Sequence, residues 1–292
     1  MKHSIHLLVI DPQNDFVDLP EDWLPPDTAP MDLRQEDSKI TPALAVPGAH
    51  QDMLRLAGAI EVGSGGISSI YVTLDSHHFV GIERPTFWMI AGGGPVGPFT
   101  EITLEQVVQG QYLPRNLDSL PRVKDYLRRL EAAGRYKLMV WPVHCQIGTW
   151  GHGVHDAVRR ACNQWEATQQ QFVNFVTKGA NPFTEHYSPF QAEVVLAEDA
   201  STARNIPFIH TFAQADRIFV AGQASSHCVK AGVTDLAAHL GGDLGRIVLV
   251  RDCMSAVAGF EAQQAKFFAD MAARGLQVCT AADMAAELKA NA

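Results

Sequence analysis

Cys228 is the residue of this sequence best placed to do covalent chemistry. It follows the apolar and small residues 220–226, and residues 229–240 after it have the composition of a helix. A sulfur at the start of a helix lies at the positive end of the helix dipole, which favours the thiolate, the nucleophilic form of cysteine. A free cysteine can equally be a small buried hydrophobic residue, so this segment alone leaves both interpretations open.

Five reactive side chains each come after a short stretch that predicts a strand, and the first two of these strands are expected to be buried. These strands are expected over residues 5–10, 67–74, 137–140, 172–176 and 217–221, and the side chains that follow them are Asp11, Asp75, His144, Lys178 and Cys228. In open parallel sheets, ligands bind in the crevice along the carboxyl ends of the strands. The sequence therefore predicts one site at that edge.

A nucleophilic cysteine needs a partner that takes its proton and later returns it to a leaving group. Asp11 is the better candidate, because it follows a fully apolar strand, where burial raises a carboxyl pKa unless a cation holds it. Lys178 can be that cation. His227 is adjacent to Cys228, and we expect it to point away from the sulfur. Taken singly, Asp11 and Lys178 also fit a helix cap and a surface ion pair.

Asp75 and His77 lie two residues apart, so they share one face if the segment is extended. His144 follows the next predicted strand. Two histidines and one carboxylate with open positions suit first-row metals such as zinc, iron or manganese. A hydrogen-bonded Asp–His pair without a metal is the alternative.

The wider pattern of the 292 residues predicts an α/β fold. Helical stretches alternate with the strands, and two more strands are expected over 246–250 and 276–279. We expect a three-layer sandwich, with a mostly parallel sheet of about six strands and helices on both faces. One domain spans 1–292, with an irregular insertion at about 79–121 that serves as an interface or a lid. The helices are expected over residues 50–62, 123–133, 153–168, 229–240 and 259–273.

Charge and composition exclude several classes of function. The formal net charge is −9 and there is no long basic run, so nucleic acid and membranes are not expected partners. The five cysteines are an odd number and widely scattered, which suits a reducing compartment. The first residues lack the apolar core of a secretory signal. We therefore expect a cytoplasmic protein.

Three motifs together resemble the isochorismatase-like cysteine hydrolases, and the nicotinamidases in particular. The motifs are Asp11-Pro12-Gln13-Asn14-Asp15-Phe16, then Lys178-Gly179 with Tyr187-Ser188 and Phe190, and Gly222-Gln223-Ala224 with Cys228-Val229. The resemblance implies a catalytic triad of Asp11, Lys178 and Cys228. It also implies a cis peptide between Gln223 and Ala224, with an oxyanion hole formed by the backbone N–H groups of Ala224 and Cys228.

Two further segments resemble the nicotinamidase metal site. Asp75-x-His77 and Trp141-Pro142-x-His144-Cys145 imply that Asp75, His77 and His144 hold one divalent metal ion, with zinc favoured over iron or manganese. In that family the pyridine nitrogen of the substrate coordinates the metal. Phe16 and Trp141 would then pack against the substrate ring, with burial in the core as the alternative for both.

The resemblance implies a metal-dependent cysteine amidohydrolase that cleaves a small carboxamide, with nicotinamide converted to nicotinate and ammonia through a thioester. It also implies a homo-oligomer, a dimer or a tetramer. The chain departs from the family beside the expected pocket, because His78 replaces the usual proline and the S-F-A-x-x-H segment is absent. Two alternatives follow: a metal-independent hydrolase of a ureide or carbamoyl compound, similar to ureidoacrylate or N-carbamoylsarcosine amidases, and a non-catalytic binding protein on the same fold.

Overall fold

A six-stranded, entirely parallel sheet forms the centre of the protein. The structure is a computed structural model that describes residues 2–29, 35 and 37–292. The strand order is β10-β9-β8-β1-β2-β7. The strands are β1 (Ile5–Ile10), β2 (Ser69–Asp75), β7 (Asn174–Lys178), β8 (Arg217–Gly222), β9 (Ile247–Val250) and β10 (Gln277–Cys279).

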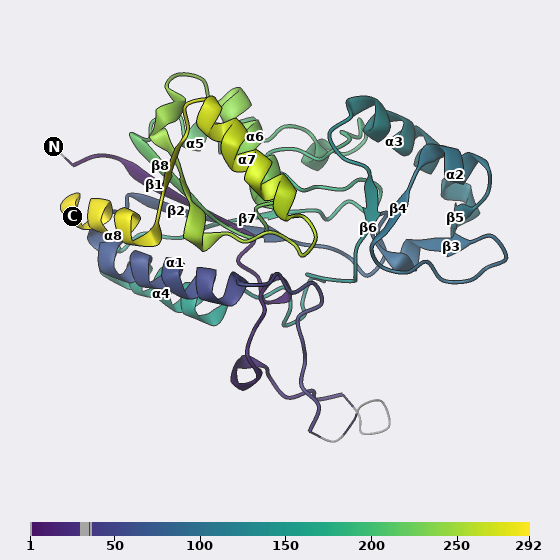
Figure 1. The fold of residues 1–292 in the computed structure, drawn as a ribbon, viewed down its shortest axis with the longest axis horizontal. Coiled ribbons are helices and arrows are strands. Elements are labelled where there is room, and N and C mark those ends of the chain that lie inside the picture. The colour runs from purple at the N-terminus through teal and green to yellow at the C-terminus, as the bar shows by residue number, and fades with distance from the viewer. Residues whose placement is uncertain (1, 30–34, 36) are drawn as a thin grey trace.

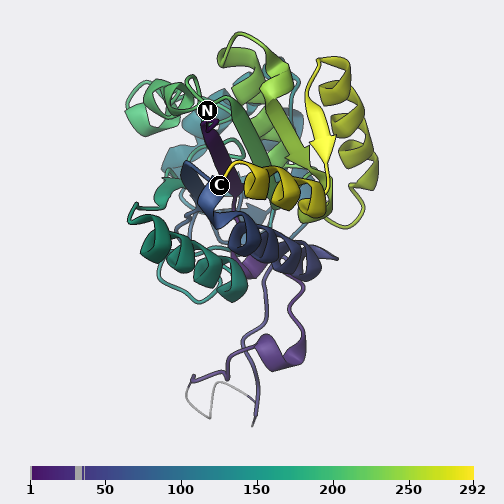
Figure 2. The same ribbon diagram turned by 90° about the vertical axis from the view of Figure 1, so that its left-hand side faces the viewer.

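Helices cover both faces of this sheet, as Figures 1 and 2 show. One face carries α1 (Ala49–Gly63), α4 (Asp156–Gln169) and α8 (Ala281–Ala290). The other carries α5 (Ile206–Thr211), α6 (Cys228–His239) and α7 (Glu261–Ala273). The predicted three-layer α/β sandwich is confirmed. In the part of the chain that the structure describes, no helix is long and apolar enough to cross a bilayer.

The sheet forms because its inner strands are apolar on both sides. Every residue of β1 is buried, the pattern of a parallel strand covered by helices on both faces. From β1 the chain builds the sheet in one direction through β2 and β7, and later in the other through β8, β9 and β10. Strand order therefore reverses between β1 and β8, the place where open parallel sheets leave a crevice for ligands.

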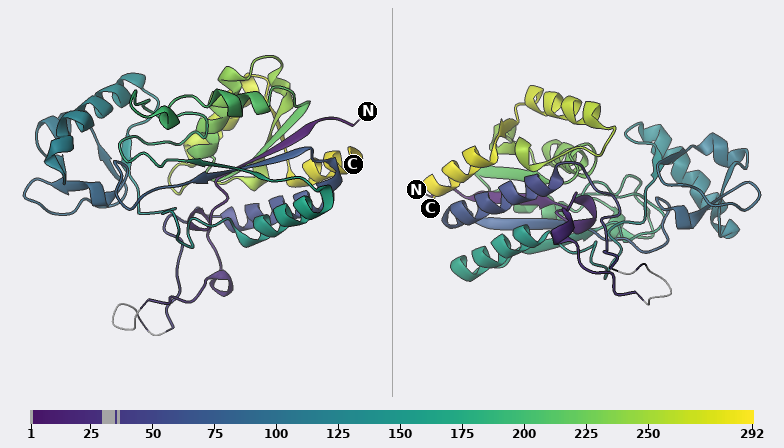
Figure 3. Two further views of the ribbon diagram at one scale, coloured as in Figure 1. Left: turned by 180° about the vertical axis from the view of Figure 1, so that it is seen from behind. Right: turned by 60° about the horizontal axis from the view of Figure 1, so that its bottom comes forward.

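A smaller lobe lies beyond the carboxyl end of the central sheet (Figures 1 and 3). It contains two antiparallel strand pairs, β3 with β5 and β4 with β6. Trp88, Tyr126 and Leu127 belong to its own hydrophobic cluster, separate from that of the sheet. Its elements are β3 (Trp88–Ile90), β4 (Thr100–Ile102), α2 (Leu104–Val108), β5 (Tyr112–Pro114), α3 (Leu120–Ala133) and β6 (Leu138–Val140).

The lobe corrects two expectations from the sequence. Residues 79–121 are not irregular throughout, because they contain three short strands and a helix. Each strand is three residues long, too short for an alternating pattern to stand out. The strand expected over 137–140 exists as β6, but it pairs with β4 and does not enter the central sheet. His144 therefore reaches the site from the lobe, and not from the sheet edge as predicted.

Candidate active site

Asp11, Lys178 and Cys228 meet at the carboxyl edge of the sheet. The ammonium nitrogen of Lys178 lies 3.0 Å from Asp11 Oδ2 and 3.7 Å from Cys228 Sγ. Asp11 follows β1, Lys178 ends β7 and Cys228 is the first residue of α6. All three side chains are buried. The structure thus brings together the three residues assigned to the triad from the sequence.

The backbone between β8 and Cys228 explains the glycine of this turn. In the ladder between β1 and β8, Gly222 is paired with Ile10. Its φ is +121°, and a Cβ atom there would lie 1.9 Å from the carbonyl oxygen of Ile10. Only glycine tolerates both the close approach and that backbone conformation. The turn can therefore hold Cys228 close to Asp11, which follows Ile10 directly.

The peptide bond between Gln223 and Ala224 is cis, as the resemblance implies. Among the N–H groups that follow it, Ser225 donates to the carbonyl of Ser255, and His227 donates to that of Ala224. The N–H of Ala224 donates to no acceptor within residues 2–29, 35 and 37–292. The N–H of Cys228 belongs to the first turn of α6, where no intrahelical acceptor exists. Both groups expected in the oxyanion hole are thus free to bind a ligand.

The electrostatics of the triad differ from the expectation for Cys228. Burial raises the pKa of the thiol well above its usual value, and the neighbouring carboxylates of Asp11 and Asp75 act in the same direction. Lys178 opposes them without reversing the shift. The resting sulfur therefore keeps its proton, and the poised thiolate predicted from the helix dipole is not the resting state. Since a charge buried in protein is costly, the sulfur ionises only when a base takes its proton.

Asp11 is the nearest such base. Thr73 Oγ1 donates a hydrogen bond to Asp11 Oδ1 at 2.6 Å, and Lys178 holds the other oxygen. Burial raises the pKa of Asp11, while Lys178 lowers it. Burial lowers the pKa of Lys178, but the charges of Asp11 and Asp75 raise it well above its usual value, so the ammonium remains charged. A base of raised pKa beside a fixed cation is suited to accept a proton from sulfur.

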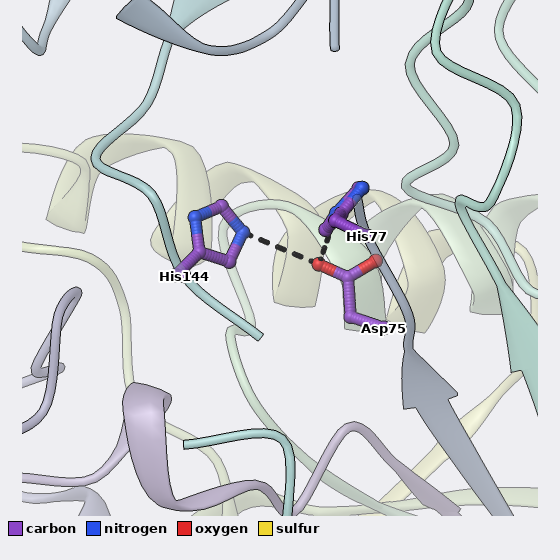
Figure 4. Close-up of side chains that lie close together, drawn as sticks. All are labelled: Asp75, His77 and His144. Carbon is purple, nitrogen blue, oxygen red and sulfur yellow. Dashed lines mark hydrogen bonds and ion pairs between the residues drawn. The ribbon is translucent and has the colours of Figure 1, made fainter. Parts of the chain in front are cut away.

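Asp75 connects this group to the two histidines, and Figure 4 shows its contacts with His77 and His144. Its Oδ1 lies 2.8 Å from Lys178 Nζ. Its Oδ2 lies 2.8 Å from His77 Nε2 and 3.3 Å from His144 Nε2. Burial raises the pKa of Asp75, but His77 and Lys178 together bring it well below its usual value, so the carboxylate is ionised.

The donor atoms of Asp75, His77 and His144 fit a metal ion. One ligand atom from each lies within 4.8 Å of the others, and all three residues are buried. The remaining ring nitrogens are engaged elsewhere, because His77 Nδ1 lies 3.0 Å from the carbonyl of Gly179 and His144 Nδ1 lies 2.8 Å from that of Pro142. Such contacts orient a histidine so that its Nε2 faces the metal. Zinc, iron and manganese all accept two imidazoles and a carboxylate.

A pocket of about 360 Å³, including the space at its mouth, opens onto Cys228 and these ligands. Phe16 and Trp141, the two aromatic residues assigned to it from the sequence, both line it. Both residues also belong to the main hydrophobic core, so each is buried in the core and lines the pocket at the same time. The lining residues are Phe16, Leu44, Asp75, Trp141, His144, Glu185, Tyr187, Ala224, His227, Cys228 and Val257.

Two residues near the site were missed from the sequence, and a third, His227, was considered but not assigned to the site. His227 lines the pocket, although we expected it to point away. Glu185 also lines it, and its place between Lys178-Gly179 and Tyr187-Ser188 could have indicated this. Glu83 is buried behind His77, with Oε1 3.2 Å from His77 Nδ1. It lies where the family segment is absent, so no motif signalled it.

Comparisons with known proteins identify the fold. No family model matches the sequence, and no curated protein matches it. Among solved structures, a nicotinamidase and pyrazinamidase from Acinetobacter baumanii is 18% identical, covers 97% of this chain and 98% of its own, and has a TM-score of 0.59. The yeast nicotinamidase is 19% identical, with coverage of 94% and 98% and a TM-score of 0.59.

A third similar structure is the pyrazinamidase of Pyrococcus horikoshii in complex with zinc. It is 17% identical, with coverage of 95% and 99% and a TM-score of 0.51. All three are matched over almost their whole length, and so is this chain. The resemblance expected from the motifs is confirmed at the level of the fold: the protein has the fold of these solved nicotinamidases and pyrazinamidases.

Proposed function

We propose that this protein is a cysteine amidohydrolase that cleaves a small aromatic carboxamide, with nicotinamide as the first candidate. The observation that carries the proposal is the position of Lys178 Nζ, in contact with Asp11, Asp75 and Cys228 at once. This contact places a base, a cation and a sulfur nucleophile around one pocket. The similar folds are those of enzymes named as nicotinamidases and pyrazinamidases.

In the first step, Asp11 takes the proton of Cys228 as the sulfur attacks the amide carbonyl carbon. Because burial raises the pKa of the thiol, the sulfur needs this base to become a nucleophile. Lys178 stays protonated and offsets the negative charge that moves between sulfur and carboxylate. The proton accepted by Asp11 then passes to the amide nitrogen, and ammonia leaves.

The carbonyl oxygen gains negative charge in this step. The free N–H groups of Ala224 and Cys228 are the donors that would stabilise it, and each such donor can lower the barrier by about 3 kcal/mol. The product of the first half-reaction is a thioester on Cys228. A water molecule, deprotonated by Asp11, would attack the thioester carbonyl and release the carboxylic acid, and the departing sulfur of Cys228 would take back the proton from Asp11.

Asp75, His77 and His144 would hold one divalent cation, for which zinc is the first candidate. When bound, it supplies a Lewis acid and an anchor for a ring nitrogen of the substrate. The aromatic walls Phe16 and Trp141 would hold the ring between this anchor and Cys228. Of the structures with a similar fold, one contains zinc, which supports the cation. Two others contain nicotinate or the inhibitor nicotinaldehyde, which support this substrate class.

Ammonia release from nicotinamide and pyrazinamide tests the proposal, with the metal content of the purified protein measured in parallel. We expect turnover of at least one of them by the wild type and none by Cys228→Ala. Cys162→Ala is the matched control, because Cys162 is also a buried free cysteine but lies on α4 away from the pocket. Ammonia release that persists in Cys228→Ala would overturn the proposal.

A screen over ureides and carbamoyl compounds separates the alternative hydrolase from this one. Activity on those substrates that survives complete removal of metal would favour the metal-independent enzyme.

We also propose that the protein is cytoplasmic and forms a homo-oligomer, a dimer or tetramer. Light scattering on the purified protein tests the oligomeric state. The mass of a monomer in that measurement would contradict it.

A further inference from the structure

Glu185 is a pocket residue that the proposed reaction does not use. Its side chain is buried, and the residue lines the same pocket as Cys228 and His144. One carboxylate oxygen, Oε1, accepts a hydrogen bond from the backbone N–H of His186 at 2.8 Å. The other oxygen has no hydrogen-bond partner among the residues that the structure describes. This oxygen, Oε2, is not fully enclosed by protein atoms, so a ligand in the pocket can reach it.

The other carboxylate of the pocket, Asp75, is already engaged, and His227 and Tyr187 each have one hydrogen-bond contact. Both oxygens of Asp75 are held, one by Lys178 and one by the two histidines. His227 Nδ1 lies 2.9 Å from Ser226 Oγ, and the hydroxyl of Tyr187 accepts a hydrogen bond from Trp141 Nε1 at 2.9 Å. Within the described pocket lining, Glu185 is therefore the carboxylate with an oxygen left for a ligand.

The surroundings allow this carboxylate to ionise under mildly alkaline conditions. Burial raises the pKa of Glu185 to about 7, Glu83 and Asp75 act in the same direction, and His77 opposes them. Above that pH the free oxygen is a charged acceptor in a pocket that largely excludes water. Such an acceptor forms a strong hydrogen bond with a donor and is penalised when the ligand offers none.

We propose that Glu185 is a specificity-determining residue whose free oxygen accepts a hydrogen bond from the substrate. The preferred substrates are then small heteroaromatic carboxamides that carry an amino, hydroxyl or ring N–H donor besides the amide itself. This inference rests on the proposed amidase function, because it names the substrate class of the same pocket. A site built around a buried polar group rejects analogues that leave that group unpaired, and it does so more strongly than an apolar pocket rejects a change of size.

The test compares substrates that differ by one donor. The quantity is kcat/KM for nicotinamide, 2-aminonicotinamide and 6-aminonicotinamide at pH 8.5, where Glu185 is ionised. We expect the wild type to favour one amino compound over nicotinamide by about tenfold or more. Glu185→Leu, which removes the acceptor, should reduce this ratio to about one, while Glu185→Gln should reduce it partly and guards against a folding defect in the leucine variant.

Glu193→Gln is the matched control. Glu193 is another largely buried glutamate of the same segment, but it faces Arg135, with Oε2 3.7 Å from Arg135 Nε, and does not line the pocket. It should leave the substrate ratio unchanged. A wild-type ratio near one for both amino compounds, or a ratio that persists in both Glu185 variants, would overturn the inference while leaving the amidase proposal intact.

Calorimetric measurement of product-acid binding distinguishes a failure of the amidase proposal from a failure of the inference on Glu185. The wild type should bind 2-amino- or 6-aminonicotinate more tightly than nicotinate, and Glu185→Leu should not. This difference without any turnover would overturn the amidase proposal and support the role of Glu185. Equal affinities in the wild type, or no binding of any of the acids, would contradict the role of Glu185.

Discussion

The sulfur side and the cation side of the pocket are built in different ways. Asp11, Lys178 and Cys228 all come from the carboxyl edge of the central sheet, through β1, β7 and the turn after β8. On the cation side, Asp75 ends β2, but His144 follows β6 of the small lobe. The sulfur side thus depends on one parallel sheet, and the cation side on how a second unit packs against it.

Asp75 contacts both sides. It pairs with Lys178 through one oxygen and with the two histidines through the other. A sheet register is rigid, since a slip by one residue would turn every side chain to the other face. The contact between lobe and sheet has no such constraint. Substitutions on the two sides should therefore have separable effects on sulfur chemistry and on metal binding.

The largest expected effect is the loss of the nucleophile. Cys228→Ala should lower kcat for the amide substrate by more than about 10³-fold, because Cys228 is the only cysteine in the described pocket lining. Metal binding should be unchanged, since Cys228 is not one of the three ligand candidates. Steady-state kinetics together with elemental analysis check both expectations. Loss of metal in this variant would show that the two sides are not separable.

The second effect is removal of a ligand on the cation side. His144→Ala should empty the metal site and lower kcat/KM for nicotinamide by at least about a hundredfold. Alkylation of Cys228 by iodoacetamide should proceed nearly as in the wild type. The matched control is His78→Ala, because His78 is exposed and outside the ligand group. Equal loss of metal in both variants would contradict the assignment of His144.

A smaller effect is expected from the lobe residue behind His77. Glu83 Oε1 lies 3.2 Å from His77 Nδ1 and 3.1 Å from Arg84 Nε. Glu83→Gln should weaken metal affinity by about tenfold to a hundredfold, because a carboxylate that holds the far nitrogen of a histidine fixes its orientation. Metal titration of the apoprotein measures this. Glu101→Gln, at an exposed lobe position, should leave the affinity unchanged.

The smallest effect concerns the pH at which the sulfur reacts. The pKa of the Cys228 thiol is raised by burial and lowered by Lys178. Alkylation by iodoacetamide should therefore be slow at pH 7 and accelerate as the pH rises above the usual thiol range. Lys178→Met removes the cation, so the pKa should rise further and the rate at pH 9 should fall severalfold. Fast alkylation of the wild type at neutral pH would show a thiolate at rest and refute this picture.

Much of the sulfur side could be predicted from the sequence, because Asp11 directly follows a fully buried strand, and the segments before Lys178 and Cys228 also have the pattern of strands. Such strands pair in parallel, and their ends meet at one edge. The ionisation state of Cys228 could not be predicted this way. The helix dipole is a local feature of the chain, whereas the burial and the two carboxylates that keep the proton on sulfur arise from distant segments.

The sequence by itself determined the parallel α/β sheet and the approximate positions of its six strands, since hydrophobic periodicity and turn glycines are local properties of the chain. Only the tertiary structure decided that β6 leaves the sheet, that the small lobe supplies His144 and Glu83, and that Glu185 faces the pocket. The physical reason is that these positions depend on packing between segments far apart in the chain. Three-residue strands and single buried charges carry no period from which such packing can be predicted.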